Sequence, residues 1–398
     1  MGWQKLVIAT IVLGGQVLKI VFICLNSAFT EGMTYQDNLL ANQVRADGHE
    51  VTIIADCHKY MDGVIVETPE EDKFLSNGIR LRRLQYRNIL GEAISGKVRA
   101  VKGLYETLEQ EQPDIIFHHG VQSWELLTVA KYKKNNSHLK LFVDNHADLN
   151  NSATTFLSRN VLHKIFYRSV VQLALPYIDK VFFVAHECGD FLKDLYNVPD
   201  HMMEFYPLGG VVPKAQERQE RRTQIRQELN LKEQDILLVH SGKMDALKRT
   251  EELLKAFLHV PNDNLRLILI GYLDEKIKEQ VEPIILADDR ISFLGWKTGV
   301  ELLDYLCACD LYMQPGSQSA TMQNALCCGS AVALFPHPSY KRLLNDSAFW
   351  VETVDDMKRL LQNISDNPES LREKQEAGQK VAKGQLDYRV LANRLYQS

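Results

Sequence analysis

The sequence has 398 residues, enough for two domains of ordinary size, and its 45% apolar and 24% charged residues are typical of a soluble globular protein. The formal net charge of −5 argues against a nucleic-acid partner. Local basic clusters still matter, because a phosphate site responds to its neighbours rather than to the total charge.

The first segment of the chain is unusual. Leu6 to Leu13 is apolar, but this run is too short to span a bilayer. Only Lys5 precedes it closely, and no small-residue cleavage site follows, so it does not resemble a signal peptide. We interpret residues 1–17 as an upstream extension or a disordered tail, and the mass of the natively expressed protein would test this.

Strand-like and helix-like segments then alternate through the first half of the chain. Short apolar runs predict strands, and longer amphipathic runs predict helices. Strands are expected near residues 19–25, 50–55, 114–118, 140–143 and 180–184, and helices near 34–46, 98–112, 123–133, 159–175 and 187–196.

A charged run without apolar periodicity interrupts this alternation at residues 213–222, and we interpret it as a linker that includes the solvated start of a helix. Beyond it, strands are expected near 235–240, 265–270, 291–294, 310–313 and 331–335. The helices are expected near 250–258, 275–286, 300–309 and 321–328, followed by a tail of helices near 355–364, 368–383 and 387–397.

This alternation predicts parallel sheets covered by helices. We therefore predict an α/β protein with two doubly wound, Rossmann-like domains, residues 18–212 and 223–385, whose loops face a central cleft. Residues 386–398 are expected to form a last helix that packs back on the first domain.

The loop expected after the first strand of the second domain carries two lysines. An apolar run ends at His240, Gly242-Lys243 follows, and Lys248 precedes the next helix. A diphosphate carries about two negative charges, which two ammonium groups would balance in a partly dry cleft. Solvated surface lysines are the alternative, but the position after a strand and a glycine favours the phosphate site.

Two further loops have features of a phosphate site. In the second domain, Gly316 allows close backbone approach, and Ser319-Ala320-Thr321 offers backbone N–H groups at a helix start. In the first domain, the loop after the first strand contains a single glycine, Gly32. An ordinary capped helix start and a plain strand-to-helix connection are the respective alternatives.

Histidines end two strands of the first domain. His118-His119-Gly120 ends one, and the segment from Asp144 through His146 to Asp148 ends the next. Polar groups at the carboxyl ends of strands are typical of α/β sites. His146 could donate a hydrogen bond to a phosphate or a sugar hydroxyl, and Asp148 could orient a hydroxyl. A structural role for His146 is an equal alternative, whereas a metal site made of the three histidines lacks a motif.

Basic residues interrupt the apolar run of the helix expected near residues 159–175. Arg159, Lys164 and Arg168 are spaced along it, as in helices that lie on an anionic membrane surface. A core helix with a solvated basic edge is the alternative, and we favour it slightly.

The seven cysteines are an odd number, and most lie in apolar runs. This favours reduced, buried thiols in a cytoplasmic protein over a disulfide framework. Neither pair of close cysteines has zinc-ligand spacing. The cysteines are Cys24, Cys57, Cys188, Cys307, Cys309, Cys327 and Cys328.

Taken together, these motifs resemble the GT-B glycosyltransferases, and most closely their retaining family 4, which uses nucleotide sugars. The resemblance extends from Leu18 to about Phe335. In the first half it rests on Gly32-Met-Thr, on Gly48-His-Glu-Val51, on Pro113-Asp114, on Asp179-Lys-Val181, on His146, where the family keeps a histidine near the transferred sugar, and on Pro207-Leu-Gly-Gly210.

In the second half, Lys243 and Lys248 match the basic pair of the family that holds the donor diphosphate, and Gly295-Trp296 matches the segment that contacts the base. One departure is clear. The family usually has two glutamates eight positions apart; the second, which holds the ribose, aligns with Asn324, and the first has no counterpart, although Gln318 and Ser319 lie nearby. An amide can bind hydroxyls but cannot be a charged acceptor.

The resemblance implies a cytoplasmic bacterial enzyme that transfers a sugar from a nucleotide diphosphate, with retention and without metal or other cofactor. It implies a glycan or lipid-linked acceptor in surface polysaccharide biosynthesis, and peripheral contact with the inner membrane face. A sugar-nucleotide epimerase and a non-catalytic GT-B binding module are the alternatives.

Overall fold

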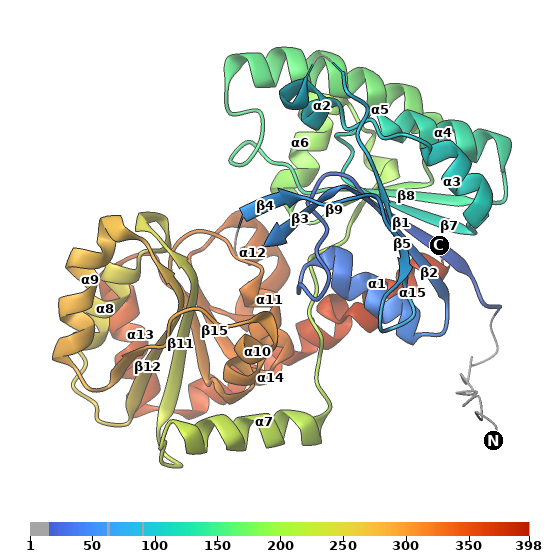
Figure 1. Cartoon of the computed structure of the whole chain (residues 1–398). Helices are drawn as coiled ribbons and strands as arrows, with labels where there is room; N and C mark the ends of the chain where they lie inside the picture. The colour runs from blue at the N-terminus through green and yellow to red at the C-terminus, as the bar shows by residue number, and fades with distance from the viewer. Residues whose placement is uncertain (1–15, 62–63, 90, 398) are drawn as a thin grey trace, which may run out of the picture. The chain divides into compact units, whose positions relative to one another are not determined.

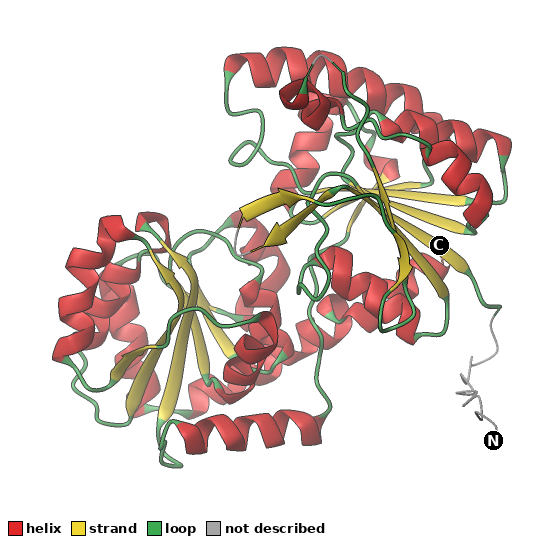
Figure 2. Cartoon of the chain, viewed as in Figure 1, coloured by secondary structure: helices red, strands yellow, loops and turns green. Residues whose placement is uncertain are grey.

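A computed structural model describes residues 16–61, 64–89 and 91–397 of the chain (Figure 1). Of the predicted extension over residues 1–17, only Gln16 and Val17 fall within the described residues. The chain forms two compact units, one ending at Pro207 and the other beginning at Leu208. Each unit is a sheet covered by helices (Figure 2), which confirms the predicted fold class. None of the described helices is both apolar and long enough for a transmembrane span.

The first unit contains an eight-stranded sheet in the order β10-β9-β8-β7-β1-β2-β6-β5. All neighbours in it are parallel except β5 and β6. Strands β3 and β4 form a separate antiparallel hairpin. The strands are β1 (Lys19–Cys24), β2 (Glu50–Asp56), β3 (His58–Met61), β4 (Val64–Glu67), β5 (Asp72–Phe74), β6 (Arg80–Leu84), β7 (Ile115–His119), β8 (Lys140–Asn145), β9 (Lys180–Phe183) and β10 (Met203–Phe205).

The helices of the first unit occupy the connections between parallel strands. They are α1 (Gln36–Ala46), α2 (Glu92–Val98), α3 (Leu104–Glu111), α4 (Glu125–Asn135), α5 (Arg168–Ala174) and α6 (His186–Tyr196). A π-helix, η1 (Ser158–Tyr167), leads directly into α5, and the short 3-10 helices η2 (Leu175–Tyr177) and η3 (Asp200–Met202) complete the unit.

The second unit contains a six-stranded parallel sheet in the order β13-β12-β11-β14-β15-β16. Its strands are β11 (Ile236–Met244), β12 (Leu265–Leu273), β13 (Ile291–Phe293), β14 (Leu311–Gln314), β15 (Ala331–Leu334) and β16 (Phe349–Trp350). Its helices are α7 (Ala215–Glu228), α8 (Thr250–Leu258), α9 (Glu275–Ala287), α10 (Gly299–Ala308), α11 (Thr321–Cys327), α12 (Pro338–Leu344), α13 (Val354–Asp366), α14 (Glu369–Val381) and α15 (Tyr388–Gln397), with the shorter η4 (Ala246–Lys248), η5 (Asn345–Ser347) and η6 (Ala382–Leu386).

Burial on both faces explains why the strands are continuous apolar runs rather than alternating ones. In β11, Leu238 packs into the core shared with α8 and α13, whereas Leu237 and Val239 pack into the opposite core with α10 and α11. Each such side chain contributes roughly 1.5–3 kcal/mol when it is fully buried. The seven cysteines are also buried and unbridged, as predicted.

Strand β6, which lies between β2 and the edge strand β5, was not predicted. Strand β6 has the sequence Arg-Leu-Arg-Arg-Leu, and its charged residues leave no apolar run that would indicate a strand. Arg80 and Arg82 pair with Glu111 on α3, while Arg83 is buried and donates to backbone carbonyls. The helix predicted over 98–112 begins later, at Leu104, and residues 92–98 form the separate helix α2.

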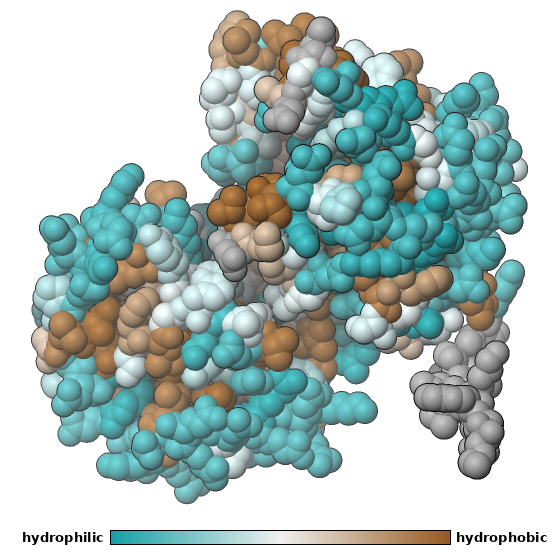
Figure 3. All heavy atoms as spheres, in the orientation of Figure 1, coloured by the Kyte–Doolittle hydropathy of each residue, from teal (hydrophilic) through white to brown (hydrophobic). Residues whose placement is uncertain are grey.

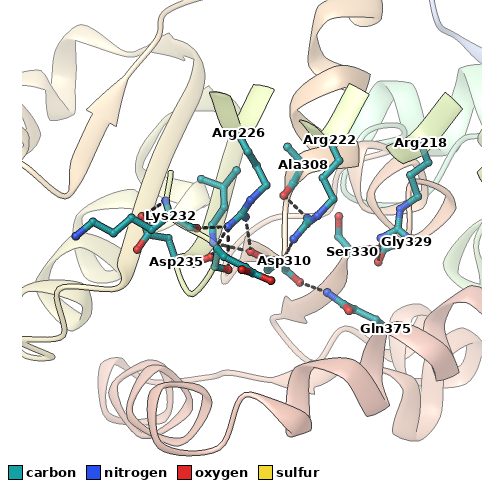
Figure 4. A network of polar contacts seen from close by, with 12 residues as sticks. Arg218, Arg222, Arg226, Lys232, Asp235, Ala308, Asp310, Gly329, Ser330 and Gln375 are labelled. Atoms are coloured by element: carbon teal, nitrogen blue, oxygen red, sulfur yellow. Dashed lines mark hydrogen bonds and ion pairs between the residues drawn. The ribbon is translucent and has the colours of Figure 1, made fainter. Parts of the chain in front are cut away.

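Residues predicted as the linker form the first half of α7, which packs on the second unit through a row of arginines (Figure 4). Arg222 donates to Asp310 Oδ1 at 2.7 Å, and Arg226 donates to Asp310 Oδ2 at 3.2 Å. Asp310 also accepts from the Leu237 backbone N–H, and its carbonyl accepts from Gln375 on α14. One carboxylate therefore ties α7, β11 and the segment before β14 together.

We predict that Asp310→Asn lowers the free energy of unfolding of the second unit by about 2–4 kcal/mol, because it leaves two partly buried guanidinium groups without their counter-ion. Urea unfolding followed by tryptophan fluorescence would measure this. The matched control is Asp304→Asn, which removes a more exposed pair with Arg221 and should cost at most about 1 kcal/mol. Equal losses in the two variants would contradict the assigned role of Asp310.

Candidate active site

Each sheet has one point at which the direction of strand addition reverses. In the first unit the chain proceeds from β1 to β2 on one side and later adds β7 on the other side of β1. In the second unit β11 has β12 on one side and β14 on the other. Ligands of open α/β sheets bind at the carboxyl ends of strands beside such a reversal. The loops after β1, β7, β11 and β14 are therefore the places to look for a site.

In the first unit, the loops after β1 and β7 are joined by direct contacts. Asn26 Nδ2 donates to the His119 carbonyl at 3.0 Å. Gly120 has a φ of +80°, and a Cβ there would collide with the Asn26 side chain, so this close approach requires glycine. Gly32 lies in the same loop as Asn26, at an exposed turn with a φ of +77°.

Two histidines share one buried carboxylate at the ends of β7 and β8. The Oδ2 atom of Asp144 lies 2.9 Å from His119 Nδ1 and 3.0 Å from His146 Nε2, and its Oδ1 atom accepts from the Gly120 N–H at 2.7 Å. Asp144 and His119 are buried, whereas the His146 side chain is 41% exposed. His146 therefore presents part of its ring to solvent while the carboxylate holds the other part.

The charges of this cluster reinforce one another. Burial alone would raise the pKa of the Asp144 carboxyl, but attraction to both imidazoles holds that pKa well below its usual range. Burial likewise disfavours the imidazolium of His146, yet the Asp144 carboxylate outweighs it and raises the pKa of His146. For His119, Asp37 and Asp144 together outweigh burial and raise the pKa.

Asp148, which the sequence suggests could orient a hydroxyl, forms hydrogen bonds within its own turn. Its Oδ1 atom accepts from the backbone N–H groups of Asn150 and Asn151, at 2.7 and 2.9 Å, and so stabilises the turn after β8. The carboxylate that contacts the His146 ring belongs to Asp144, which sequence reasoning did not single out.

His118 is separated from the other two histidines. It precedes His119 in β7, and successive residues of a strand point to opposite faces of the sheet. It is fully buried, and burial lowers the pKa of its imidazole to about 4. Ligand atoms of His119, Asp144 and His146 do lie within 4.8 Å of one another, so these three residues could hold a metal ion.

In the second unit, strand β11 runs on through Gly242 and Lys243 to Met244, so Lys243 lies in a strand and not in the predicted loop. Gly242 pairs with Gly271 of β12, with φ angles of +123° and +137°. A Cβ on Gly271 would collide with the Gly242 backbone, and the extended pairing therefore depends on glycine. The Lys243 side chain is largely exposed, 3.8 Å from the Asp274 carboxylate.

Lys248 is buried and lacks a carboxylate partner among the described residues. Its Nζ donates to the carbonyls of Ser317 and Gln318, at 3.2 and 3.4 Å, in the loop after β14. Burial lowers the pKa of its ammonium. Gly316 makes this packing possible, because a Cβ there would collide with the backbone at Leu247. The loops after β11 and β14 are thus locked together around a positive charge.

Some backbone N–H groups at the start of α11 already have hydrogen-bond acceptors within the protein. The Ser319 N–H donates to the Tyr340 hydroxyl at 2.9 Å, and the Thr321 N–H donates to Ser319 Oγ at 3.3 Å. Gln318 and Ala320 are exposed beside them. Asn324, one turn into α11, is half-buried, with its Oδ1 close to Gly210. The predicted donor residues of this loop therefore do lie together.

The predicted base-contacting segment follows β13. Gly295 has a φ of +67°, and its carbonyl accepts from the Gly271 N–H at 2.8 Å, so it lies beside the end of β12. Trp296 is 74% exposed. Tyr272, which pairs with Lys243 in the sheet, is a second exposed aromatic residue here. Sequence reasoning missed Tyr272 because the strand was predicted to end at residue 270, whereas β12 continues to Leu273.

Two doubly wound α/β units, with a basic site at the strand reversal of the second, define the architecture of the GT-B glycosyltransferases. Residues 38–209 match the family described as Glycosyltransferase Family 4, and residues 221–381 match Glycosyl transferases group 1. Together these matches cover well over half of the chain. The chain belongs to the group 1, family 4 glycosyltransferases, and is a nucleotide-sugar-dependent enzyme, as the motifs predicted.

Solved structures confirm the fold. HepE of Anabaena in complex with UDP is 14% identical, with a TM-score of 0.66 over 96% of this chain and 99% of that one. Sucrose-phosphate synthase from Thermosynechococcus elongatus is 14% identical, with a TM-score of 0.66 over 95% and 97%. WaaG, a glycosyltransferase involved in lipopolysaccharide biosynthesis, is 15% identical, with a TM-score of 0.60 over 94% and 98%. A comparison with curated protein sequences gives no match.

We predict that Asp144→Asn lowers the pKa of His146, because it removes the charge that opposes burial. Ring-carbon NMR titration of labelled histidine in EDTA-dialysed protein would measure this, with the signal assigned by its loss in His146→Gln. The matched control is Asp148→Asn, which leaves Asp144 in place and should leave the titration unchanged. An unaltered pKa in Asp144→Asn would show that Asp144 does not control His146.

Proposed function

We propose that the enzyme transfers a sugar, with retention of anomeric configuration, from a nucleotide diphosphate to a glycan or lipid-linked acceptor. The observation that carries this proposal is the buried ammonium of Lys248, which is hydrogen-bonded to carbonyls and unpaired with a carboxylate. Such a charge is costly to bury unless an anion completes its environment. HepE, which shares the fold, was solved with UDP and with UDP-glucose.

The diphosphate would lie against Lys248 and Lys243. The side-chain stem of Lys248 lies beside Gly242, since a Cβ built on Gly242 would be 3.6 Å from Lys248 Cε. Lys243 is the next residue in the chain. Ser319, Ala320 and Thr321, of which Ala320 is exposed, would border the same site. As the glycosidic bond breaks, negative charge grows on the leaving diphosphate, and fixed ammonium groups stabilise it most at that moment.

The remainder of the donor would extend along the ends of β12, β13 and β14. Gln318 and Asn324 would bind the hydroxyls of the sugar and the ribose, and Gly295 and Trp296 would contact the base. Because Asn324 stands where the family usually has a glutamate, the ribose would be held by a neutral amide. We expect weaker ribose contacts than a carboxylate would give, and a larger share of the affinity from the diphosphate.

In the first unit, His146 and Asp148 are the proposed catalytic residues, and Gly32 would approach the donor phosphates. Asp144 holds His146 through Nε2, and no group of the described residues bonds to Nδ1, which leaves that nitrogen for a sugar hydroxyl or phosphate oxygen. Asp144 is thus a positioning residue that raises the pKa of the imidazole and fixes its orientation.

We further propose that the enzyme works in the cytoplasm of a bacterium, at the inner face of the membrane, in the synthesis of a surface polysaccharide. The support is analogy: WaaG, which shares the fold, takes part in lipopolysaccharide biosynthesis. Mass analysis of products from a panel of nucleotide sugars tests the reaction. A glycosylated acceptor with released nucleotide supports transfer, whereas an isomerised donor without acceptor would indicate an epimerase.

Replacing Lys248 by methionine should remove donor binding without destabilising the apo protein, because an apolar stem replaces a buried charge that has no carboxylate partner. Wild-type protein at about one hundred times Kd gains about 2.7 kcal/mol from its nucleotide diphosphate, a shift of several degrees in Tm. Thermal shift with UDP and other nucleoside diphosphates would measure this. We expect the shift to vanish in Lys248→Met.

Lys255→Met is the matched control for that experiment, since Lys255 is an exposed lysine of α8 that pairs with Glu251. It should keep the full nucleotide shift. A Lys248→Met protein that still shows the wild-type shift would refute the proposed diphosphate site.

We predict that removing metal ions leaves the reaction intact, because the ammonium groups supply the positive charge that a metal provides elsewhere. Protein dialysed against EDTA should release nucleotide from its donor at the untreated rate. Loss of activity on dialysis, with recovery on adding Mn²⁺ or Zn²⁺, would contradict this and would favour a metal ion at His119, Asp144 and His146. The variant His119→Gln would then lose the recovery.

A further inference from the structure

The helical segment of residues 156–174, which begins just before η1 and ends with α5, exposes a face of large apolar side chains. Phe156 is 79% exposed, Leu157 71% and Ile165 62%, and Val161 and Leu173 are also exposed. Figure 3 shows hydrophobic residues along the edge of the first unit where Figure 1 labels α5. We call these five residues the outer face. Side chains of this size are rarely left exposed together unless they contact something.

The opposite side of the same segment is anchored in the protein, so the outer face is held outward. His163 Nδ1 lies 2.7 Å from the Tyr196 hydroxyl, and both residues are buried. The Tyr167 hydroxyl donates to the Lys97 carbonyl at 2.6 Å. Leu157, Val161 and Ile165 recur every fourth residue and therefore lie on one side of the helix.

The charge around the outer face is entirely positive along this stretch of chain. Residues 149–178 contain no aspartate or glutamate, although the chain as a whole has a net charge of −5. Arg159, Lys164 and Arg168 interrupt the apolar residues, and the first two are exposed. A helix with an apolar face and a basic border fits the boundary of an anionic lipid layer, where each cation contributes on the order of 1 kcal/mol.

An aromatic pair lies at the border of this segment. Trp124, which is partly exposed, stacks on Phe166 of η1 with a centroid distance of 6.2 Å and an interplanar angle of 10°. Tryptophan is enriched where an apolar phase meets water, because its ring is amphipathic. The pair therefore fits the same kind of boundary as the basic residues.

We propose that the outer face docks the first unit on an anionic membrane surface, with Phe156 and Leu157 inserted among the lipids and Arg159 and Lys164 against their headgroups. This inference extends the proposed lipid-linked acceptor, but vesicle binding requires neither donor nor turnover. Failure of vesicle binding with an intact nucleotide shift would remove only this inference, and the converse result would remove only the proposed function.

Sedimentation with vesicles tests the proposal. The full chain should bind vesicles of phosphatidylcholine with about one third phosphatidylglycerol, bind poorly to phosphatidylcholine alone, and dissociate at about 0.5 M salt. The double variant Phe156→Ser/Leu157→Ser should bind at least about tenfold more weakly. Arg159→Gln/Lys164→Gln should also lose about tenfold, on the anionic vesicles only.

The matched control is Phe74→Ser/Leu286→Ser, which removes the same two side-chain types from exposed positions elsewhere. It should bind vesicles like wild type, and all variants should keep the wild-type Tm and nucleotide shift. Two results would overturn the proposal. One is equal vesicle binding by the outer-face variant and the control. The other is that wild-type protein does not bind anionic vesicles but forms a dimer, and that Phe156→Ser/Leu157→Ser is monomeric. The outer face would then be a protein interface.

Discussion

A buried ammonium group without a carboxylate partner is the feature on which the account of this enzyme depends. Lys248 is surrounded by the loops that follow β11 and β14, and its Nζ contacts only carbonyl oxygens among the described residues. Carbonyl dipoles offset part of the cost of burial, and burial lowers the pKa of the ammonium. We propose that a bound diphosphate would offset more of this cost.

Both units bring a buried charged group to one edge of a sheet, but the two charges have opposite signs. In each, parallel strands bring loops from distant parts of the sequence to one edge of the sheet, and glycine permits the close contact, as at Gly120 and Gly316. The first unit has a buried carboxylate, Asp144, beside two histidines, whereas the second has a buried ammonium, Lys248, beside two backbone carbonyls. We infer that the first unit orients an imidazole toward the sugar, and that the second unit holds the leaving group.

Much of this could be predicted from the sequence, because strands buried on both faces appear as apolar runs and each is followed by a polar loop. The central strands, the helices between them and the position of Lys248 follow from that pattern. Strand β6 could not be predicted, since its arginines are neutralised by Glu111, a partner more than 25 residues away. Asp144 was missed for a related reason: only the fold brings His119 to it.

The structure of the protein with a bound nucleoside diphosphate would test the central claim most directly. We expect phosphate oxygens within hydrogen-bond distance of Lys248 Nζ, with Lys243 turned from Asp274 toward the same group. A diphosphate bound elsewhere, with Lys248 still donating only to the Ser317 and Gln318 carbonyls, would contradict it.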